Sequence, residues 1–311
     1  MSVRLAASLT LGLVAVAALG AAATYAWAVR NQSVATLDWI DSRFARPVAT
    51  LPPVRRSYGD DPQQIVAVYR PAGVANPPLV IFIHGGGWQN GSPADYGFVA
   101  RAFAQGGYAT ALVGYRLGDA GRFPAMLEDS AAAVRWLLDH ASELGVSTET
   151  LLLSGHSAGA YNAVMLALDR QWLGREGVPD DIVKGVAALA GPYDFYPWDS
   201  DYSRAAFGGW SDPRQTQPIA FARGDAPPLL LVTGDADETV RPRNSQVLAA
   251  RQAELGARAE IRVLPGFSHA GTLTHLARPF DRDRREIDAV MTFFDSIALN
   301  PASAAVQAAV S

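Results

Sequence analysis

The chain has 311 residues, of which 49% are hydrophobic and 18% charged, so it can bury a full core. The formal net charge of -4, with no long run of either sign, excludes nucleic acid as an expected partner. The absence of cysteine excludes a thiol nucleophile, a disulfide framework and a thiolate metal site. Chemistry must therefore come from serine, histidine and carboxylates, and we expect neither a metal nor a cofactor.

Residues 1–31 are expected to form a signal anchor or a signal peptide. Leu5 to Val29 is almost wholly apolar and carries no charge. This run exceeds the roughly 20 residues that a membrane-spanning helix needs, which favours an uncleaved single-pass anchor with the catalytic domain outside the cytoplasm. Ala21-Ala22-Ala23 and Ala26-Trp27-Ala28 also fit a signal-peptidase site, so a cleaved signal peptide and a periplasmic or secreted enzyme are the alternative.

Residues 32–60, which include three prolines, are interpreted as a linker and lead-in, and residues 300–311 as a flexible tail. Between them, residues 61–299 alternate short apolar strands with helix-period segments, which predicts one α/β catalytic domain. Strands that are apolar on both faces imply a mostly parallel sheet with helices on both faces. The irregular segment 192–226 is a candidate lid. The expected strands are 65–69, 79–83, 108–115, 151–153, 183–190, 229–233 and 261–264, and the expected helices begin at Pro93, Pro124, Ala160, Pro242 and Arg285.

A nucleophile elbow is predicted at Ser157. The pattern Gly155-His156-Ser157-Ala158-Gly159 follows a buried strand and precedes a helix that begins at Ala160. The two glycines permit the sharp turn that exposes the serine oxygen, and the helix N-terminus favours negative charge there. A glycine-rich turn with a solvated serine is the alternative interpretation of the bare pattern, and the strand and helix argue against it.

A glycine loop, His84-Gly85-Gly86-Gly87-Trp88, follows the strand 79–83. An oxyanion requires two or more main-chain N–H groups aimed at one point, and we expect them from Gly86, Gly87 and Ala158. A phosphate-binding glycine loop is the alternative, but neither G-x-G-x-x-G nor a following Lys-Ser/Thr is present. His84 and His156 are interpreted as structural residues.

The acid and the base are expected on loops after late strands, in the chain order serine, acid, histidine. The strand 229–233 leads into Asp235, Asp237 and Glu238, and the strand 261–264 leads into His269. His269 is expected to accept the Ser157 proton and Asp237 to orient His269. Asp235 and Glu238 remain alternatives to Asp237, which is preferred because the first carboxylate usually caps the loop.

These motifs together resemble the bacterial carboxylesterases of the α/β-hydrolase superfamily, near its hormone-sensitive-lipase-like and feruloyl-esterase-like branches. The resemblance covers about Ile65 to Ile297 and implies an α/β-hydrolase fold. The chain is also similar to kynurenine formamidase, whose loop is usually H-G-G-Y-W where this chain has Gly87. The G-D-S-A-G elbow typical of the hormone-sensitive-lipase branch is absent.

The expected function is hydrolysis of small-molecule carboxylic esters through an acyl-enzyme on Ser157. The substrate-binding residues are expected to be Trp88, Tyr161 and Tyr193, the last in the aromatic segment 192–210. An arylformamidase-type amide hydrolase is the first alternative, and a catalytically inactive binding protein on the same fold is the second. The sequence makes no prediction of the oligomeric state.

Overall fold

The computed structural model describes residues 20, 34–198 and 200–298. Apart from Gly20, the expected signal segment 1–31 lies outside these residues, as does the expected tail 300–311. Within the described part of the chain, no helix has both the length and the apolar character needed to cross a membrane. The anchor and the tail stay predictions.

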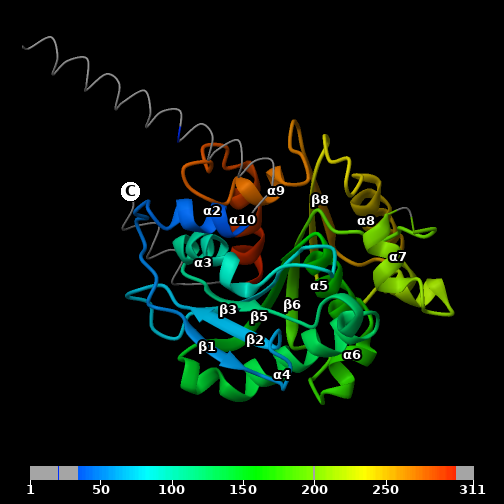
Figure 1. The fold of residues 1–311 in the computed structure, drawn as a ribbon, viewed down its shortest axis with the longest axis horizontal. Helices are drawn as coiled ribbons and strands as arrows, with labels where there is room; N and C mark the ends of the chain where they lie inside the picture. The colour runs from blue at the N-terminus through cyan, green and yellow to red at the C-terminus, as the bar shows by residue number, and fades with distance from the viewer. Residues whose placement is uncertain (1–19, 21–33, 199, 299–311) are drawn as a thin grey trace, which may run out of the picture.

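The described residues form one eight-stranded sheet in the order β1-β2-β4-β3-β5-β6-β7-β8 (Figure 1). β1, β2 and β4 pair antiparallel in turn, and every other pairing is parallel, which confirms the predicted sheet. The strands are β1 (Val54–Ser57), β2 (Ile65–Tyr69), β3 (Pro78–Ile83), β4 (Ala109–Val113), β5 (Ser147–His156), β6 (Val183–Leu189), β7 (Leu229–Gly234) and β8 (Ala259–Leu264).

The central strands are buried on both faces of the sheet, and successive side chains of a strand point to opposite faces. In β3, Leu79, Ile81 and Ile83 belong to one apolar cluster. Val80 and Phe82, which alternate with them, belong to the other cluster. This alternation explains why the strand sequence is apolar at every position.

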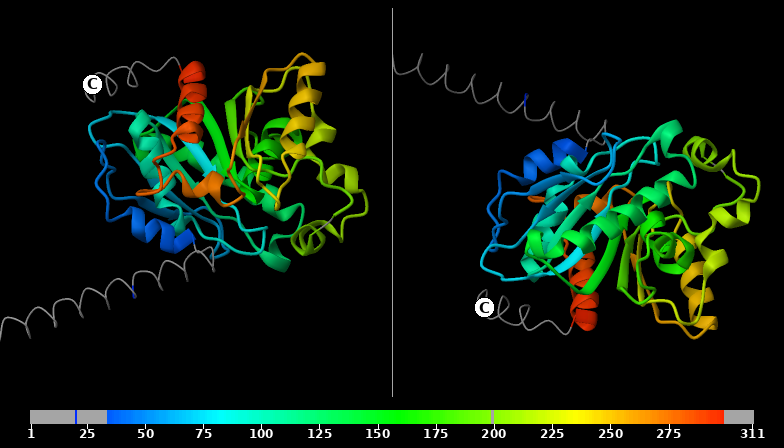
Figure 2. Two further views of the ribbon diagram at one scale, coloured as in Figure 1. Left: turned by 90° about the horizontal axis from the view of Figure 1, so that it is seen from above. Right: turned by 90° about the horizontal axis from the view of Figure 1, so that it is seen from below.

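Helices cover both faces of the sheet, as predicted (Figure 2). Buried side chains of α4, α5, α6 and α8 join one cluster, and those of α3, α9 and α10 join the other. The prediction of strand 151–153 was too short, because β5 already begins at Ser147, which pairs with Pro78 of β3. The helices are α2 (Val34–Asp41), α3 (Gly97–Phe103), α4 (Ala125–Leu144), α5 (Ala158–Leu168), α6 (Arg170–Arg175), α7 (Asp201–Phe207), α8 (Arg243–Glu254), α9 (Gly271–Thr274) and α10 (Arg285–Ala298).

The interpretation of residues 32–60 as an irregular lead-in was wrong for two stretches. α2 packs on the domain through Asp41, which is fully buried and accepts hydrogen bonds from Arg46 and Arg101. β1 adds an edge strand beside β2. The partners of Asp41 lie outside α2, so no local pattern marks this helix as part of the domain.

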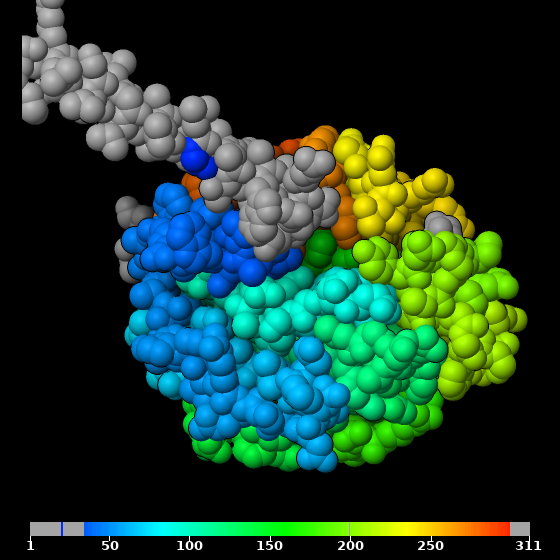
Figure 3. Space-filling view, in the orientation of Figure 1, coloured from blue at the N-terminus to red at the C-terminus, as the bar shows by residue number. Residues whose placement is uncertain are grey.

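The candidate lid, residues 192–226, lies between β6 and β7 and contains α7 and two short 3₁₀ helices, Pro213–Thr216 and Pro218–Phe221. Phe207 of α7 is buried and contacts Trp88 edge-on, with ring centroids 4.8 Å apart. Figure 3 shows the first described residues in blue and the region of α7 in yellow-green on opposite sides of the molecule. The segment is thus packed on the domain, and its opening as a lid stays a prediction.

Candidate active site

Ser157 lies in the sharp turn between β5 and α5. Its φ and ψ angles are 56° and -120°, a conformation that residues other than glycine rarely adopt. Gly159 permits the turn, because a Cβ atom there would collide with the main-chain oxygen of Ile83. The strand, turn and helix expected around G-x-S-x-G are therefore present.

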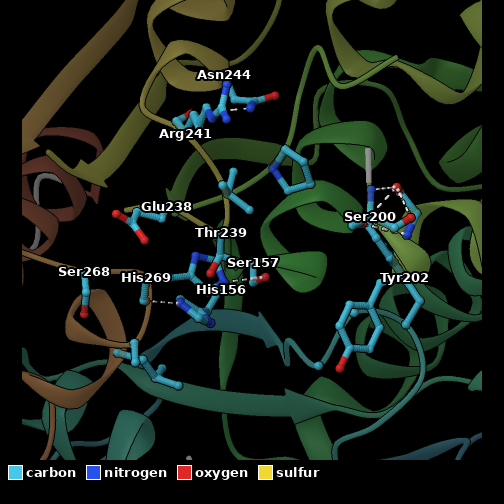
Figure 4. Close-up of a pocket in the computed structure, with 18 of the residues that line it drawn as sticks. His156, Ser157, Ser200, Tyr202, Glu238, Thr239, Arg241, Asn244, Ser268 and His269 are labelled. Carbon is cyan, nitrogen blue, oxygen red and sulfur yellow. Dashed lines mark hydrogen bonds between the residues drawn. The ribbon is translucent and has the colours of Figure 1, made fainter. Parts of the chain in front are cut away.

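Ser157, His269 and Asp237 form one chain of hydrogen bonds. Ser157 Oγ lies 2.9 Å from His269 Nε2 (Figure 4). His269 Nδ1 lies 2.8 Å from Asp237 Oδ2. The three residues follow β5, β8 and β7, whose carboxyl ends share one edge of the parallel sheet. A carboxylate only accepts hydrogen bonds, so Nδ1 of His269 is the donor to Asp237, and in the neutral imidazole this leaves Nε2 as the acceptor for the serine hydroxyl.

Asp237 is held more firmly than its two competitors. Its side chain is fully buried, and Oδ1 accepts hydrogen bonds from the N–H groups of Thr239 and Val240 at 2.9 and 2.8 Å. Asp235 is exposed and accepts a hydrogen bond from the N–H of Gly266, which joins the loops after β7 and β8. Glu238 is exposed at the cavity wall. Of the three carboxylates, Asp237 is thus the one that contacts His269.

The glycine loop has left-handed backbone angles at three successive residues, with φ of 113° at Gly86, 61° at Gly87 and 59° at Trp88. A Cβ atom at Gly86 would collide with the main-chain oxygen of Asn90, so this turn requires glycine. Trp88 Nε1 donates to Asn162 Oδ1 of α5 at 3.2 Å, which ties the loop to the helix that follows Ser157. Gly86 and Gly87 line the same cavity as Ser157, and Ala158 is buried directly after it.

His84 is a buried structural residue, as expected. Its Nδ1 donates to the main-chain oxygen of Gly85 at 2.7 Å, and its ring stacks on Tyr115 with centroids 4.7 Å apart. Tyr115 in turn donates its hydroxyl to the main-chain oxygen of His84. Burial lowers the pKa of His84 to about 4, so the ring is neutral at neutral pH.

His156 contributes more than the packing expected of it. Its Nε2–H donates a hydrogen bond to the main-chain oxygen of His269, 3.1 Å away. Burial, with a further contribution from His269, lowers the pKa of His156 to about 3. A neutral His156 therefore links the elbow to the loop that carries His269. In the sequence, the only indication of this role was that His156 directly precedes Ser157.

A cavity of about 1010 Å³ opens above Ser157 and His269. In Figure 4, Tyr202 lies on one side of these residues, and Ser268 and Glu238 lie on the other. The ring of Tyr202 also packs over Gly87, where a Cβ atom would come within 2.7 Å of it. The cavity walls come from α2, the glycine loop, the segment 192–203, the loop after β7 and the region of α9.

Of the three predicted substrate-binding residues, only Trp88 lines this cavity. Tyr161 is fully buried, because α5 is enclosed on every side, and its ring contacts Trp88 edge-on at 5.4 Å. Tyr193 is also fully buried, with its ring packed against Gly191. The prediction of direct substrate contact was therefore wrong for Tyr161 and Tyr193, which support the wall from behind. Phe195, Tyr196 and Tyr202 of the same aromatic segment line the cavity instead.

No group of three or more histidine, aspartate or glutamate side chains in the described ranges could hold a metal ion.

Comparison with known proteins places the fold among esterases. The chain is 27% identical to esterase LipC of Mycobacterium tuberculosis over 248 residues, which cover 71% of this chain and 60% of LipC. It is 26% identical to kynurenine formamidase of Salmo salar over 233 residues, 70% of this chain and 75% of that protein. The chain thus spans less than two thirds of the length of LipC.

Among solved structures, the carboxylesterase EstE1 from a metagenomic library superposes with a TM-score of 0.69 at 23% identity, covering 88% of this chain and 97% of EstE1. This similarity confirms the predicted α/β-hydrolase fold. The BD-FAE family model matches residues 66–252, which is more than half of the chain. The match includes the glycine loop, the elbow and Asp237, and the chain belongs to the BD-FAE family.

Proposed function

We propose that the protein hydrolyses carboxylic esters through an acyl-enzyme on Ser157. The observation that carries the proposal is the unbroken chain of hydrogen bonds from Ser157 through His269 to Asp237 at the floor of a large cavity. The similarity to LipC supports the choice of an ester as substrate.

In the proposed first step, His269 Nε2 accepts the hydroxyl proton as Ser157 Oγ attacks the ester carbonyl carbon. Asp237 stabilises the imidazolium that forms, and its fixed Oδ1 keeps the carboxylate oriented. The N–H groups of Gly86, Gly87 and Ala158 are the proposed donors to the oxyanion. Three left-handed residues hold the first two donors in place before the substrate arrives.

The tetrahedral intermediate collapses when His269 gives its proton to the leaving alcohol oxygen, which breaks the ester bond and leaves Ser157 acylated. Water then enters, His269 takes a proton from it, and the hydroxide attacks the acyl carbon. The same oxyanion donors serve this second step. Release of the acid returns the proton to Ser157.

The experiment is turnover of p-nitrophenyl acetate by the full chain and by Ser157→Ala. We expect kcat to fall by about four orders of magnitude, because the acyl-enzyme cannot form. A fluorophosphonate probe should label the wild-type protein on Ser157 and leave the variant unlabelled. Retained turnover in the variant would refute the proposal, and a wild-type protein that the probe does not label would favour the inactive binding protein.

Formamide hydrolysis is the second candidate, favoured by the similarity that covers 75% of kynurenine formamidase. The proposed residues would cleave an N-formyl group by the same two steps. A kcat/KM for N-formylkynurenine above that for short p-nitrophenyl esters would make the formamidase the better assignment. An activity profile from p-nitrophenyl acetate to p-nitrophenyl palmitate would define the acyl preference.

We also propose, from the sequence alone, that Leu5 to Val29 exports the domain and anchors it in the membrane. Sequencing of the mature N-terminus tests cleavage, and trypsin accessibility in intact spheroplasts tests export.

A further inference from the structure

Besides the aromatic residues of the segment that includes Phe195 and Tyr202, the cavity has two wall regions that differ in their chemistry. The wall after β7 is polar and includes Glu238, Arg241 and Asn244. The wall formed by α2 and the region of α9 is mostly apolar, and Thr36 and Thr274 are polar residues in it. The apolar lining residues of this second wall are Val34, Leu37, Ile40, Ala270, Leu273 and Phe280.

The position of α2 in this wall follows from the spacing of its side chains. Val34, Leu37 and Ile40 recur every three residues and so share one face of the helix, which lines the cavity. Trp39 lies outside the lining and is 57% exposed. One face of the eight-residue helix α2 thus lines the cavity.

Buried ion pairs hold α2 in place. Asp41 is fully buried, and its two oxygens accept hydrogen bonds from Arg46 and Arg101, each at 2.6 Å. Asp41 also accepts a hydrogen bond from the main-chain N–H of Arg278 at 2.7 Å. Arg46 donates a hydrogen bond to the main-chain oxygen of Leu276 at 2.9 Å. These bonds attach α2 to the chain that follows α9, so the two parts of the apolar wall are fixed to one another.

The position of this wall relative to His269 indicates which part of the ester, the acyl group or the alcohol, contacts it. In the proposed reaction, His269 gives its proton to the leaving alcohol oxygen, so the alcohol lies on the His269 side of the ester carbonyl. Ala270 follows His269 directly in the chain, Leu273 lies in α9 four residues after His269, and both line the cavity. Tyr202, whose ring packs over Gly87 of the glycine loop, lies on the other side of Ser157 and His269 (Figure 4).

We infer that the α2 and α9 wall binds the alcohol part of the ester, and that Leu37 and Ile40 select esters of extended apolar alcohols. This inference rests on the proposed ester hydrolysis and adds the substrate class. An apolar alcohol chain removes its surface from water against these side chains while the reaction centre stays on Ser157. The methyl group of a methanol ester is too short to make this apolar contact with the wall.

The test measures kcat/KM for methyl, butyl and hexyl acetate with the full chain, by titrating the acetic acid released. The acyl group is then constant and only the alcohol changes. We expect kcat/KM to rise from methyl to hexyl acetate in the wild type. Leu37→Ala should lower the value for hexyl acetate about tenfold more than the value for methyl acetate, because truncation removes apolar contact along the alcohol. Ile40→Ala should act in the same direction.

Trp39→Ala is the matched control on the same helix, and it should leave the three values in their wild-type ratio. Methyl hexanoate against methyl acetate is the acyl control, and Leu37→Ala should not change that ratio. An equal loss for all three alcohols, or a loss that follows the acyl chain, would overturn the inference while leaving ester hydrolysis intact. A wild-type protein that cleaves none of these esters or p-nitrophenyl acetate would overturn both proposals.

Discussion

His156 donates a hydrogen bond from Nε2 to the main-chain oxygen of His269, 3.1 Å away, so the residue before the nucleophile holds the loop of the proposed base. His156→Ala removes this donor. We expect kcat for p-nitrophenyl acetate to fall by about 100-fold with little change in KM, because small displacements of a catalytic group slow the chemical step. His156→Gln retains an N–H donor and should recover part of the loss. Wild-type kcat in His156→Ala would show that the bond does not position His269.

The two buried histidines predict acid sensitivity of the fold. The pKa is about 4 for His84 and about 3 for His156, whereas an unfolded histidine titrates near 6.5. Between these values the unfolded chain binds protons that the folded chain does not. The free energy of unfolding should therefore fall as the pH drops from about 6.5 to about 4, by about 1.4 kcal/mol per pH unit for each histidine.

Urea unfolding at several pH values measures this slope. His84→Gln removes one titrating group and should reduce the slope between pH 4 and 6.5, whatever its effect on stability at pH 7. An unchanged slope in this variant would contradict the assignment of His84 as a buried neutral residue.

Glu286 predicts the opposite pH dependence. It is fully buried in α10, and neither side-chain oxygen has a hydrogen-bond partner among the described residues. Burial raises its pKa well above the usual value, so the folded state retains a proton that the unfolded state releases above about pH 4.5. The stability contribution of this group is present at low pH and is lost as the pH rises. Glu286→Gln carries no proton to lose, so its stability relative to wild type should increase from pH 4.5 to pH 8 in urea unfolding. A constant difference would contradict the prediction.

Asp41 predicts a large loss of stability when its buried ion pairs are broken. Asp41→Ala leaves Arg46 without its closest carboxylate, and Arg46 is itself only 6% exposed. We expect the free energy of unfolding to fall by about 3 kcal/mol, measured in urea. Asp288→Ala breaks an ion pair whose carboxylate side chain is 57% exposed and should cost less than about 1 kcal/mol. Equal effects of the two substitutions would rule out a special role for Asp41.

The sequence predicted the elements that carry a local pattern. The elbow at Ser157 has glycines at fixed offsets between an apolar strand and a helix, and the glycine loop follows another apolar strand. Parallel strands place such loops at one edge, so the approach of His269 to Ser157 could be expected from chain order alone. The strands from β2 to β8 could be predicted because each contains a short apolar run, which is a local pattern.

Features that depend on partners far away in the chain could not be predicted from the sequence. α2 is short, and its attachment through Asp41 involves Arg101 and Arg278, 60 and 237 residues away. Tyr161 was misassigned because closeness to the elbow in sequence does not give the direction of a side chain. It belongs to a helix whose residues are all buried, and only the packed structure reveals that no face is open.

The apolar wall formed by α2 and α9 lies outside the part of the chain that defines the family. The family match begins at residue 66 and ends at residue 252, whereas α2 ends at Asp41 and α9 begins at Gly271. Both segments of this wall are therefore separate in the chain from the glycine loop and the elbow. Transplanting α2 together with its arginine partners onto a relative is accordingly a route to new alcohol specificity without altering the nucleophile.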